Sequence, residues 1–542
     1  MPETLPFDPA FLPYPGTRYP VCAGRGMVNA SSPQAAAAGL EALRKGGNAA
    51  DAAVAAATAL TVVEPTANGI GGDAFALVWI EKDKKLYGLN ASGWAPEKLS
   101  LEAAKKAAGG DRMPSLGWLP VMVPGAPAAW AALTGRFGKL PMATSMAPAV
   151  SYAREGYPVS PCLARMWQRA AGKYQNALKG GEFAEWFRTF LPEGKAPACG
   201  QRVKLRNHAE TLEEIAATRS ESFYRGELAE KIVADSQAFG GFFGLNDLAD
   251  YHPDWVEPAA LDYRGYTVCE IPPNGQGIVA LMALNILKNL EFMEKESAIT
   301  FHRQWEAMKI AFADGKRFIT DQKAMAMPWQ QLLDPAYGAA RANEIGSLAA
   351  IPGPGRPNGS GTVYLCTADG EGNMVSYIQS NYMGFGSGIV VRNTGIALQN
   401  RGHDFSLNPA EANRLAPRKK SYHTIIPGFL MKDGQAVGPF GVMGGYMQPQ
   451  GHVQVVMNLV DFGLNPQQAL DAPRWQWMKG KAFAVETGFS PAIIGQLQAR
   501  GHDITISPDS PLFGRGQMIW KMPGGSLLGA TEGRTDSSIA CY

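Results

Sequence analysis

Cysteine is scarce in this chain, with six residues in a length of 542. None of the six stands at the short paired spacing of a metal-binding or redox motif. They are scattered over Cys22, Cys162, Cys199, Cys269, Cys366 and Cys541. This distribution argues against a disulfide framework and against a zinc site with cysteine ligands, so we expect free thiols and no bound metal.

An excess of charge of either sign is also missing. The chain has 50 lysines and arginines against 48 aspartates and glutamates, which gives a net charge of +2, and charged residues make up 18% of the total. No basic stripe and no acidic tail stands out along the sequence. We therefore expect no binding to nucleic acid, which needs a basic surface to neutralise its phosphates.

Long apolar runs and a secretory leader are lacking as well. The longest apolar stretch, residues 52–63, is too short to cross a bilayer and is interrupted by two threonines. Residues 1–15 carry Glu3 and Asp8 among several prolines, and have neither a basic start nor an apolar core. The sequence thus predicts a cytoplasmic protein without a membrane segment.

What the chain does have is a threonine placed for cleavage of its own backbone. Thr362 follows a stretch rich in proline and glycine, residues 351–361, and opens a β-branched run over 362–369. A threonine after a glycine is most often just the first residue of a strand. If the Gly361–Thr362 bond is cut, however, Thr362 gains a free α-amine beside its hydroxyl, and this amine can act as the base for its own nucleophile. The reference pKa of an α-amine, roughly 7.7–8.0, suits that task near neutral pH.

Four blocks elsewhere in the chain support this interpretation of Thr362. In chain order they are residues 46–53 leading into 63–73, residues 362–373, residues 385–388 with 400–406, and residues 444–445 before 461–465. In content, order and spacing these blocks resemble the signature of the γ-glutamyltransferase family, whose members are N-terminal-nucleophile hydrolases. The resemblance covers nearly the whole chain, and four blocks in the same order are far more specific than one glycine motif.

A coarse reading of the pattern gives the expected elements. We expect helices over 34–45 and 48–63, a strand over 74–80, and a mostly helical region from 101 to 293. After Thr362 the pattern changes to short β runs and glycine turns with one helical stretch near 465–472, which is typical of antiparallel sheets.

The resemblance implies more than these patterns do. It implies an α+β fold, a four-layer αββα sandwich, with residues 1–361 and 362–542 as large and small subunits of one precursor. The two products would form one compact unit, with a homodimer of processed heterodimers as a further possibility. It implies neither a cofactor nor a metal.

The catalytic residues implied by the resemblance are four. Thr362 matches the nucleophile, and Ser380, eighteen residues later, matches a second hydroxyl that bonds the nucleophile and its amine. Gly444 and Gly445 match a glycine pair whose consecutive backbone N–H groups stabilise the oxyanion. Without the family, such a pair would be read as a tight turn or bulge, and Ser380 as a strand serine.

The substrate pocket departs from the family pattern. Ser92 stands where family members carry an arginine that binds the substrate α-carboxylate, and a neutral, short hydroxyl cannot replace a charged, bidentate fork. His423 and Thr424 stand in place of a serine pair that contacts the same carboxylate. His423 could bond a substrate carbonyl or be a packed core histidine, and the sequence leaves both alternatives open.

Other polar residues of the pocket are retained or could compensate. Asp404 matches the family's contact to the substrate α-amine, and Asn400 lies nearby. Cations in these neighbourhoods could replace the missing arginine, although a solvated surface position is the more common fate of such side chains. The candidates are Arg401, His403, Lys419 and Lys420.

The sequence therefore predicts an autoprocessed amide hydrolase or acyltransferase that acts on a small-molecule amide, with water or an amine as acceptor. γ-Glutamyl compounds of the glutathione type are possible substrates, but the loss of the carboxylate anchor predicts that they are handled poorly. Two alternatives stay open: an acylase for cephalosporin- or oxamate-type amides, and a catalytically silent relative kept as a binding protein.

Overall fold

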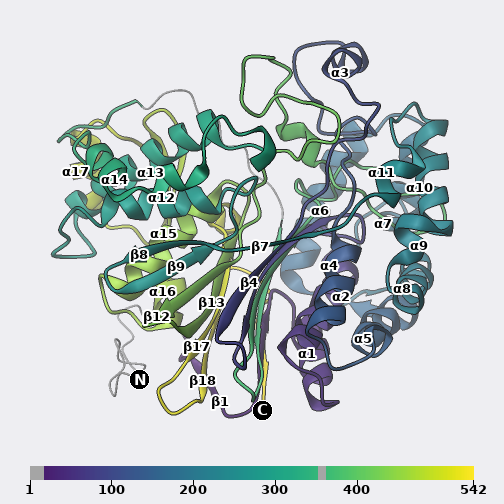
Figure 1. Ribbon diagram of the computed structural model, residues 1–542, viewed down its shortest axis with the longest axis horizontal. Helices are drawn as coiled ribbons and strands as arrows, with labels where there is room; N and C mark the ends of the chain where they lie inside the picture. The colour runs from purple at the N-terminus through teal and green to yellow at the C-terminus, as the bar shows by residue number, and fades with distance from the viewer. Residues whose placement is uncertain (1–17, 352–361) are drawn as a thin grey trace.

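The computed structural model describes residues 18–351 and 362–542. Two seven-stranded sheets pack face to face in the middle of the molecule, and a layer of helices covers the outer side of each (Figure 1). This is the four-layer α+β sandwich that the resemblance implies, and that expectation is confirmed. Every strand pair inside the two large sheets is antiparallel.

The first sheet combines strands from both ends of the chain. In spatial order it contains β1 (Val21–Ala23), β18 (Leu527–Thr531), β17 (Arg515–Lys521), β13 (Gln435–Met443), β12 (Gly428–Lys432), β9 (Tyr266–Glu270) and β8 (Ala259–Tyr263).

The second sheet is assembled in the same way. In spatial order it contains β19 (Ser538–Cys541), β2 (Met27–Ala30), β10 (Val363–Ala368), β11 (Met374–Ser380), β3 (Asp73–Ile80), β4 (Lys85–Ala91) and β7 (Asp254–Val256). Both sheets thus combine strands from before and after Thr362. Two small sheets complete the strands: β5 (Tyr157–Pro158) with β6 (Arg202–Val203), and β14 (Trp475–Lys479), β15 (Ala482–Glu486) and β16 (Asp503–Ser507).

Helices form the two outer layers. Beside the second sheet lie α1 (Pro33–Arg44), α2 (Ala49–Val63), α4 (Ala126–Arg136), α5 (Met142–Glu155), α6 (Pro161–Ala177), α7 (Ala184–Phe190), α8 (Arg206–Thr218), α9 (Glu221–Arg225), α10 (Glu227–Ala238) and α11 (Leu245–Ala249). Beside the first sheet lie α12 (Gly277–Leu287), α13 (Ala298–Phe318), α14 (Pro335–Ala342), α15 (Met447–Val460), α16 (Pro466–Asp471) and α17 (Pro491–Ala499). The short α3 (Leu101–Ala108) stands apart at the top of the view in Figure 1. No helix among the described residues is long and apolar enough to span a membrane.

Helix α2 shows how the sequence builds the layer beside the second sheet. The Asn48 side chain accepts hydrogen bonds from the first turn, and the Asp51 carboxylate accepts the Asn48 N–H in return. This reciprocal cap starts the helix at Ala49, as the sequence predicts to within one residue. Every residue of α2 is buried, and its many alanines allow it to pack closely on α1 and on β10 and β11.

One expectation about element type is wrong: the part after Thr362 holds three described α-helices where one was expected. The region from 101 to 293 is mostly helical, as predicted, and it also carries the short strands β5 to β9. Helix α15 was not predicted from the sequence. It is buried almost throughout and contains Pro449 and Gly451, so its sequence has neither a polar stripe nor a typical helical composition.

Candidate active site

Thr362 lies in the interior of the sandwich, where β10 begins. It directly precedes Val363, the first residue of β10, in the middle of the second sheet. The side chain is buried, and its Oγ1 lies 3.2 Å from the Oγ of Ser380, the last residue of β11. The structure therefore places these two predicted residues in direct contact. Gly361, the other side of the predicted cleavage bond, lies outside the described residues.

Ser380 is itself held in place from the following turn. Its Oγ accepts the backbone N–H of Tyr382 at 2.8 Å. Tyr382 has a φ of 75°, a left-handed conformation that a tyrosine adopts only when its surroundings enforce it. Asn400 supports the same turn, because its Oδ1 accepts the Met383 N–H at 3.1 Å and its Nδ2 donates to the Ser115 carbonyl at 2.8 Å. Both ends of the Asn400 amide are therefore hydrogen-bonded to the backbone, at Met383 and Ser115.

Gly444 and Gly445 form the junction between β13 and α15. Their φ values are 138° and 60°, so both adopt conformations that favour glycine. Among the described residues neither backbone N–H has a hydrogen-bond partner. The Gly445 carbonyl accepts from Gln276 Nε2 at 2.8 Å, and the same amide donates to the Thr424 carbonyl at 2.6 Å. Gln276 thus ties the glycine pair to the segment that carries Thr424.

The facing sheets bring this junction toward Thr362. Phe440 of β13 contacts Ser376, which pairs with Cys366, while Gly441 packs against the Tyr364 ring. Successive residues of β13 therefore lie beside successively earlier residues of β10. The next residues along β13 lead to Gly444, on the side where Thr362 lies.

A charged cluster lies beside this centre. Arg401 and Asp404, at the two ends of the 3-10 turn η4 (Arg401–Asp404), form an ion pair at 3.2 Å. The Asp404 Oδ1 accepts the hydroxyl protons of Tyr382 at 2.6 Å and Tyr446 at 3.4 Å. Burial and the nearby Asp404 charge raise the pKa of both phenols well above the usual value, so they stay protonated and donate. Asp404 consequently has three donors before any substrate arrives.

The Arg401 side chain is held by several contacts, but not all of its hydrogen-bond donors have an acceptor. Its Nη1 also donates to Thr424 Oγ1 at 2.9 Å, and the guanidinium stacks 3.8 Å from the centre of the Tyr382 ring. The side chain is 1% exposed, so the expectation of a solvated surface charge is wrong for this residue. Nε and Nη2 have no hydrogen-bond partner in the described part of the chain.

His423 lies in the core between the two sheets. Its ring packs 4.8 Å from that of Phe75, its Nε2 is 2.9 Å from Asp73 Oδ2, and its Nδ1 accepts the Ile425 N–H at 3.3 Å. Burial lowers the pKa of His423 well below the usual value, and burial raises that of Asp73 to about 7. Both ring nitrogens are occupied by protein groups, so the geometry matches the packed core alternative.

Ser92 is enclosed in a small network of amides. It is 1% exposed, and its Oγ donates to Asn90 Oδ1 at 2.7 Å and accepts from Asn274 Nδ2 at 3.2 Å. Asn274 continues the network by donating to the Ser421 carbonyl at 2.7 Å. At this position the short Ser92 hydroxyl therefore links two asparagine side chains through hydrogen bonds.

The remaining cations near the pocket are all engaged in the structure. His403 Nδ1 lies 2.7 Å from the Met113 carbonyl. Lys419 donates to two backbone carbonyls, and Lys420 pairs with Asp254 at 2.5 Å. Both lysines are buried, so the expectation of solvated charges is wrong for them too.

Several pocket residues were not predicted as site residues, although Asp73 ends the 63–73 block of the family resemblance. Tyr382, Tyr446, Gln276 and Asp73 come from four distant segments and meet only in the fold. The position of Tyr382, two residues after Ser380, could likewise have pointed to that residue.

One buried cluster has the composition of a metal site. His302, Glu306 and His502 each place a ligand atom within 4.8 Å of the others. However, Lys309 Nζ already pairs with Glu306 at 2.5 Å, and the two imidazoles bond each other at 2.9 Å. The Lys309 ammonium already supplies the positive charge at Glu306, while His502 Nδ1 has no hydrogen-bond partner among the described residues.

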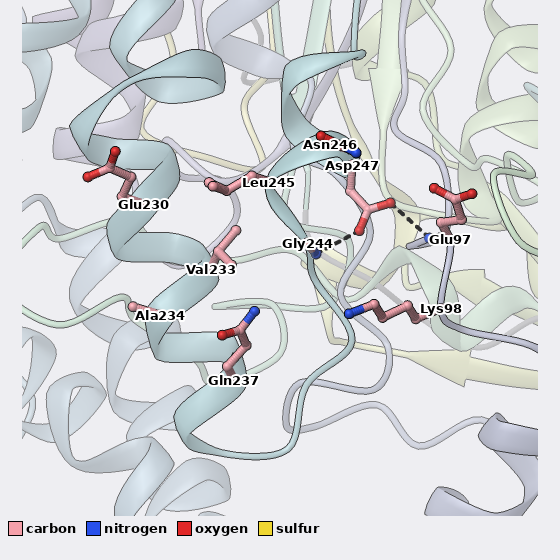
Figure 2. Close-up of a pocket in the computed structure, with 10 residues that line it drawn as sticks. All are labelled: Glu97, Lys98, Glu230, Val233, Ala234, Gln237, Gly244, Leu245, Asn246 and Asp247. Atoms are coloured by element: carbon pink, nitrogen blue, oxygen red, sulfur yellow. Dashed lines mark hydrogen bonds between the residues drawn. The ribbon is translucent and has the colours of Figure 1, made fainter.

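A hollow of about 690 Å³ opens on the surface between α10, α11 and the segment around Glu97. Figure 2 shows Asp247 at its wall, where the carboxylate accepts the backbone N–H groups of Gly244 and Glu97, each at 2.8 Å. None of the predicted catalytic or substrate residues lines this hollow.

Comparisons with known proteins agree with one another over nearly the whole chain. A family model described as gamma-glutamyltranspeptidase matches residues 35–542. The chain is 36% identical to the glutathione hydrolase-like YwrD proenzyme of Bacillus subtilis, over 93% of this chain and 96% of that protein. It is 35% identical to the oxamate amidohydrolase proenzyme of Klebsiella pneumoniae, over 95% and 98% respectively. Among solved structures, a cephalosporin acylase from Bacillus halodurans is similar with a TM-score of 0.95 and 56% identity over 99% of both chains.

Proposed function

The chain belongs to the gamma-glutamyltranspeptidase family of hydrolases and acyltransferases, and we propose that it is a self-processing amidohydrolase with Thr362 as its nucleophile. The observation that carries this proposal is the 3.2 Å contact between Thr362 Oγ1 and Ser380 Oγ at the start of a central strand. It joins the one threonine that cleavage would turn into an N-terminus to a second hydroxyl able to orient it.

Maturation would begin with an attack of Thr362 Oγ1 on the carbonyl carbon of Gly361. The C–N bond of the peptide breaks as the C–O bond of an ester forms, and the released nitrogen takes up the proton that the Thr362 hydroxyl loses and becomes the α-amine of Thr362. Water then hydrolyses the ester and leaves residues 1–361 with a new carboxyl end. The reaction is intramolecular, because the attacked carbonyl belongs to the residue bonded to the nucleophile.

Turnover would use the same atoms a second time. The α-amine of Thr362 takes the proton from Oγ1 as that oxygen attacks the substrate amide, and then gives a proton to the departing amine. The Gly444 and Gly445 N–H groups would receive the negative oxygen of the tetrahedral intermediate. Water resolves the resulting acyl ester and returns the enzyme to its starting state.

The pocket supports amides other than γ-glutamyl compounds as the better substrates. Ser92 offers no positive charge for an α-carboxylate, and Asp404 already accepts from three protein donors, which weakens its hold on an α-ammonium. Two similar proteins carry the names oxamate amidohydrolase and cephalosporin acylase. We therefore propose acylase-like hydrolysis of a small amide with water as acceptor.

Gel electrophoresis of purified protein tests the proposal. Wild type should convert from one full-length band into two products, and Edman sequencing of the smaller product should begin at Thr362. Thr362→Ala should stay full length and inactive, whereas Thr362→Ser should still be cut, only more slowly. Thr505→Ala, at an exposed threonine of β16, is the matched control and should process normally. Normal cleavage of the Thr362→Ala chain would refute both the site and the nucleophile.

A further inference from the structure

A histidine of α15 completes the hydrogen bonding of β13 just before the glycine pair. Strand β12 begins at Gly428, opposite Phe440, so β13 continues past this neighbour. Beyond that point the Val442 N–H donates to His452 Nε2 at 3.1 Å. Both residues are buried, so removal of the imidazole would leave this N–H without its acceptor. His452 therefore stands in for a neighbouring strand, two residues before Gly444.

This contact fixes where the His452 ring carries its proton. Because Nε2 accepts from Val442, it presents a lone pair, and the proton of the neutral ring is at Nδ1. Nδ1 lies 2.6 Å from Oε1 of Glu270, the last residue of β9, and donates to it. Oε1 accepts this bond whether the carboxyl is charged or neutral. Glu270 therefore selects the tautomer in which Nε2 holds the backbone of β13.

Burial keeps the His452 ring neutral. It lowers the pKa of His452 to about 3, and the charge of Arg474 adds to this effect. Burial also raises the pKa of Glu270 well above its usual value. A protonated ring would donate at both nitrogens and would lose its bond with the Val442 N–H. Near neutral pH His452 therefore stays an acceptor at Nε2.

The glycine pair lies between two fixed points of the backbone. One is the Val442 N–H, and the other is the Gly445 carbonyl, which accepts from Gln276 Nε2 at 2.8 Å. Between them the two glycines have φ values of 138° and 60°, and glycine backbone has more conformational freedom than that of any other residue. The direction of their N–H groups therefore depends on how firmly the flanking residues are held.

Both fixed points lead back to the start of α12. Gln276 directly precedes this helix, and Glu270 lies against its first residue, because a Cβ placed on Gly277 would come within 2.9 Å of Glu270 Oε2. A side chain at position 277 would push the carboxyl away from His452. Strand β9 and helices α12 and α15 thus contact one another beside the end of β13.

We propose that His452, oriented by Glu270, is a positioning residue for the N–H groups of Gly444 and Gly445. This inference rests on the proposed amidohydrolase function and adds two residues to it. Both residues act through Val442, on the direction of donors that bind the negative oxygen only in the transition state. Loss of the pair should therefore lower kcat and leave KM unchanged.

Substitutions of the pair test this role in the processed enzyme, on the best substrate among acetyl, glutaryl and γ-glutamyl 4-nitroanilide. His452→Phe keeps a flat ring without nitrogens and should lower kcat by roughly ten- to a hundredfold, because misdirected donors lose part of their hold on the oxyanion. His452→Gln, whose amide oxygen can accept the Val442 N–H, should recover much of this loss. Glu270→Leu should resemble His452→Phe, whereas Glu270→Gln keeps an acceptor for Nδ1 and should stay near wild type.

Gln454→Leu is the matched control. Gln454 lies two residues further along α15, is buried, and accepts the Trp475 N–H with its Oε1 at 3.1 Å. The variant therefore also deprives a buried backbone N–H of its acceptor, but on β14 and not on β13. It should lower Tm about as much as His452→Phe and leave kcat unchanged. Equal losses of kcat in the two variants would overturn the inference, because the packing of α15 alone would then explain them.

Two further measurements test how the effect reaches the site. In a chain that already carries Gly444→Ala, His452→Phe should reduce kcat little further, and full additivity of the two losses would overturn the inference. ¹⁵N NMR of histidine-labelled protein needs no turnover, and the His452 signal is assigned by its absence from His452→Phe. It should show Nδ1 protonated and Nε2 unprotonated in wild type, and Glu270→Leu should change this. A wild-type ring protonated at Nε2 would also overturn the inference.

The outcomes separate this inference from the function on which it rests. An enzyme that is cut at Thr362 and active, but insensitive to His452→Phe, would overturn the positioning role and leave the amidohydrolase standing. A wild-type chain that is not cut and hydrolyses none of the anilides would overturn the function itself, and the inference with it. If His452→Phe fails to fold, Glu270→Leu, His452→Gln and the wild-type tautomer still decide.

Discussion

Ser380 contacts both the proposed nucleophile Thr362 and the turn that carries Tyr382. It contacts Thr362 Oγ1 with its hydroxyl and receives the Tyr382 N–H at the same oxygen. The same serine therefore contacts the proposed nucleophile on one side and, on the other, holds the turn that carries the Tyr382 ring over Arg401. Removing the Ser380 hydroxyl should therefore disturb the orientation of the Thr362 side chain before it disturbs the rest of the pocket.

Ser380→Ala is expected to slow self-cleavage and turnover by roughly ten- to a hundredfold, because a hydrogen bond to the nucleophile is lost and the Tyr382 N–H is left buried without an acceptor. A time course of the two-band conversion on gels and kcat on an anilide measure both effects. Ser380→Thr keeps the hydroxyl and should recover much of the rate. Ser376→Ala removes another buried hydroxyl of β11 that bonds Tyr364, and serves as the control. Equal loss in the two alanine variants would contradict the role given to Ser380.

Ser92→Arg is expected to fail as a way of building a γ-glutamyl site. The sequence alone predicts that an arginine here would restore the carboxylate anchor, but the structure encloses Ser92 between Asn90 and Asn274 with 1% exposure. A buried guanidinium without an anion should lower stability by about 3 kcal/mol or more. Thermal unfolding should show a lower Tm, and kcat/KM on γ-glutamyl anilide should not rise, while Ser92→Ala should fold nearly normally. A stable Ser92→Arg enzyme with improved γ-glutamyl turnover would contradict this account.

The residues of the site differ in how well their surroundings could be predicted from the sequence. Thr362 and Ser380 were paired by the resemblance, and the structure places them in contact, while their roles stay predictions. His423 was left between two alternatives, since only the positions of Asp73 and Phe75 decide which groups surround its ring. The free edge of Arg401 was beyond sequence reasoning, because hydrogen-bond satisfaction depends on partners that the fold brings from elsewhere.

The junction between β13 and α15 is the element on which the proposed oxyanion stabilisation depends. The glycine pair was predicted from the family pattern, but the helix that follows it was not, since Met447–Val460 is buried on all sides and lacks amphipathic periodicity. The helix matters for function. Its N-terminus lies next to the two free N–H groups and adds its partial positive charge to them.

Gly444→Ala should reduce kcat by roughly a hundred- to a thousandfold, the usual cost of losing one oxyanion donor. The φ of 138° is strained for alanine, so the peptide will rotate and its N–H will point elsewhere. Gly434→Ala is the matched control, since it has a φ of 71° in the β12–β13 turn with open space around it. Both variants carry backbone strain, and only Gly444→Ala should lose activity in steady-state assays. Similar losses in both would show that strain alone explains the effect.

At the scale of the whole molecule, the two predicted products are interleaved. In the second sheet β2 pairs with β10 and β19, and β3 pairs with β11, so strands from before and after Thr362 are hydrogen-bonded to one another at several places. The layer architecture could be predicted through the family resemblance, but not from periodicity. Hydrophobic alternation identifies a strand without naming its partner, and β2 and β19 are separated by almost the entire chain.

A buried carboxyl between the products should give stability a distinct pH dependence. Glu64, at the end of α2, accepts from Ser31 and pairs with Arg515 of β17 at 3.4 Å, and burial raises its pKa to about 7. A carboxyl that keeps its proton longer in the folded state stabilises it fully below the unfolded pKa near 4.5, and this contribution is lost as pH rises through about 7. Urea unfolding at pH 5 and pH 8 should show a drop of about 3 kcal/mol from this group in wild type.

Glu64→Gln should flatten that part of the pH dependence, because glutamine does not titrate. Asp73, whose pKa burial also raises to about 7, will leave a remaining slope of the same sign. Glu102→Gln, at an exposed glutamate of α3, should follow the wild-type profile. A Glu64→Gln profile that parallels wild type between pH 5 and pH 8 would contradict the assignment.

The interleaving also predicts what happens after cleavage. The products 1–361 and 362–542 should stay together, since separating them would break the β2–β10 and β3–β11 ladders and expose the core between the sheets. Contacts outside the sheets add to this, including Thr367 Oγ1 on the Ala49 carbonyl at 2.7 Å. Processed wild type and the uncut Thr362→Ala chain should therefore elute at the same volume in gel filtration, while denaturing gels show two bands and one. Urea should release the two products only at the concentration where the circular dichroism of the whole protein is lost. Dissociation of the products before that transition would mean that the mixed strand pairs, such as β2–β10 and β3–β11, separate while the rest of the fold stays intact, and it would contradict this prediction.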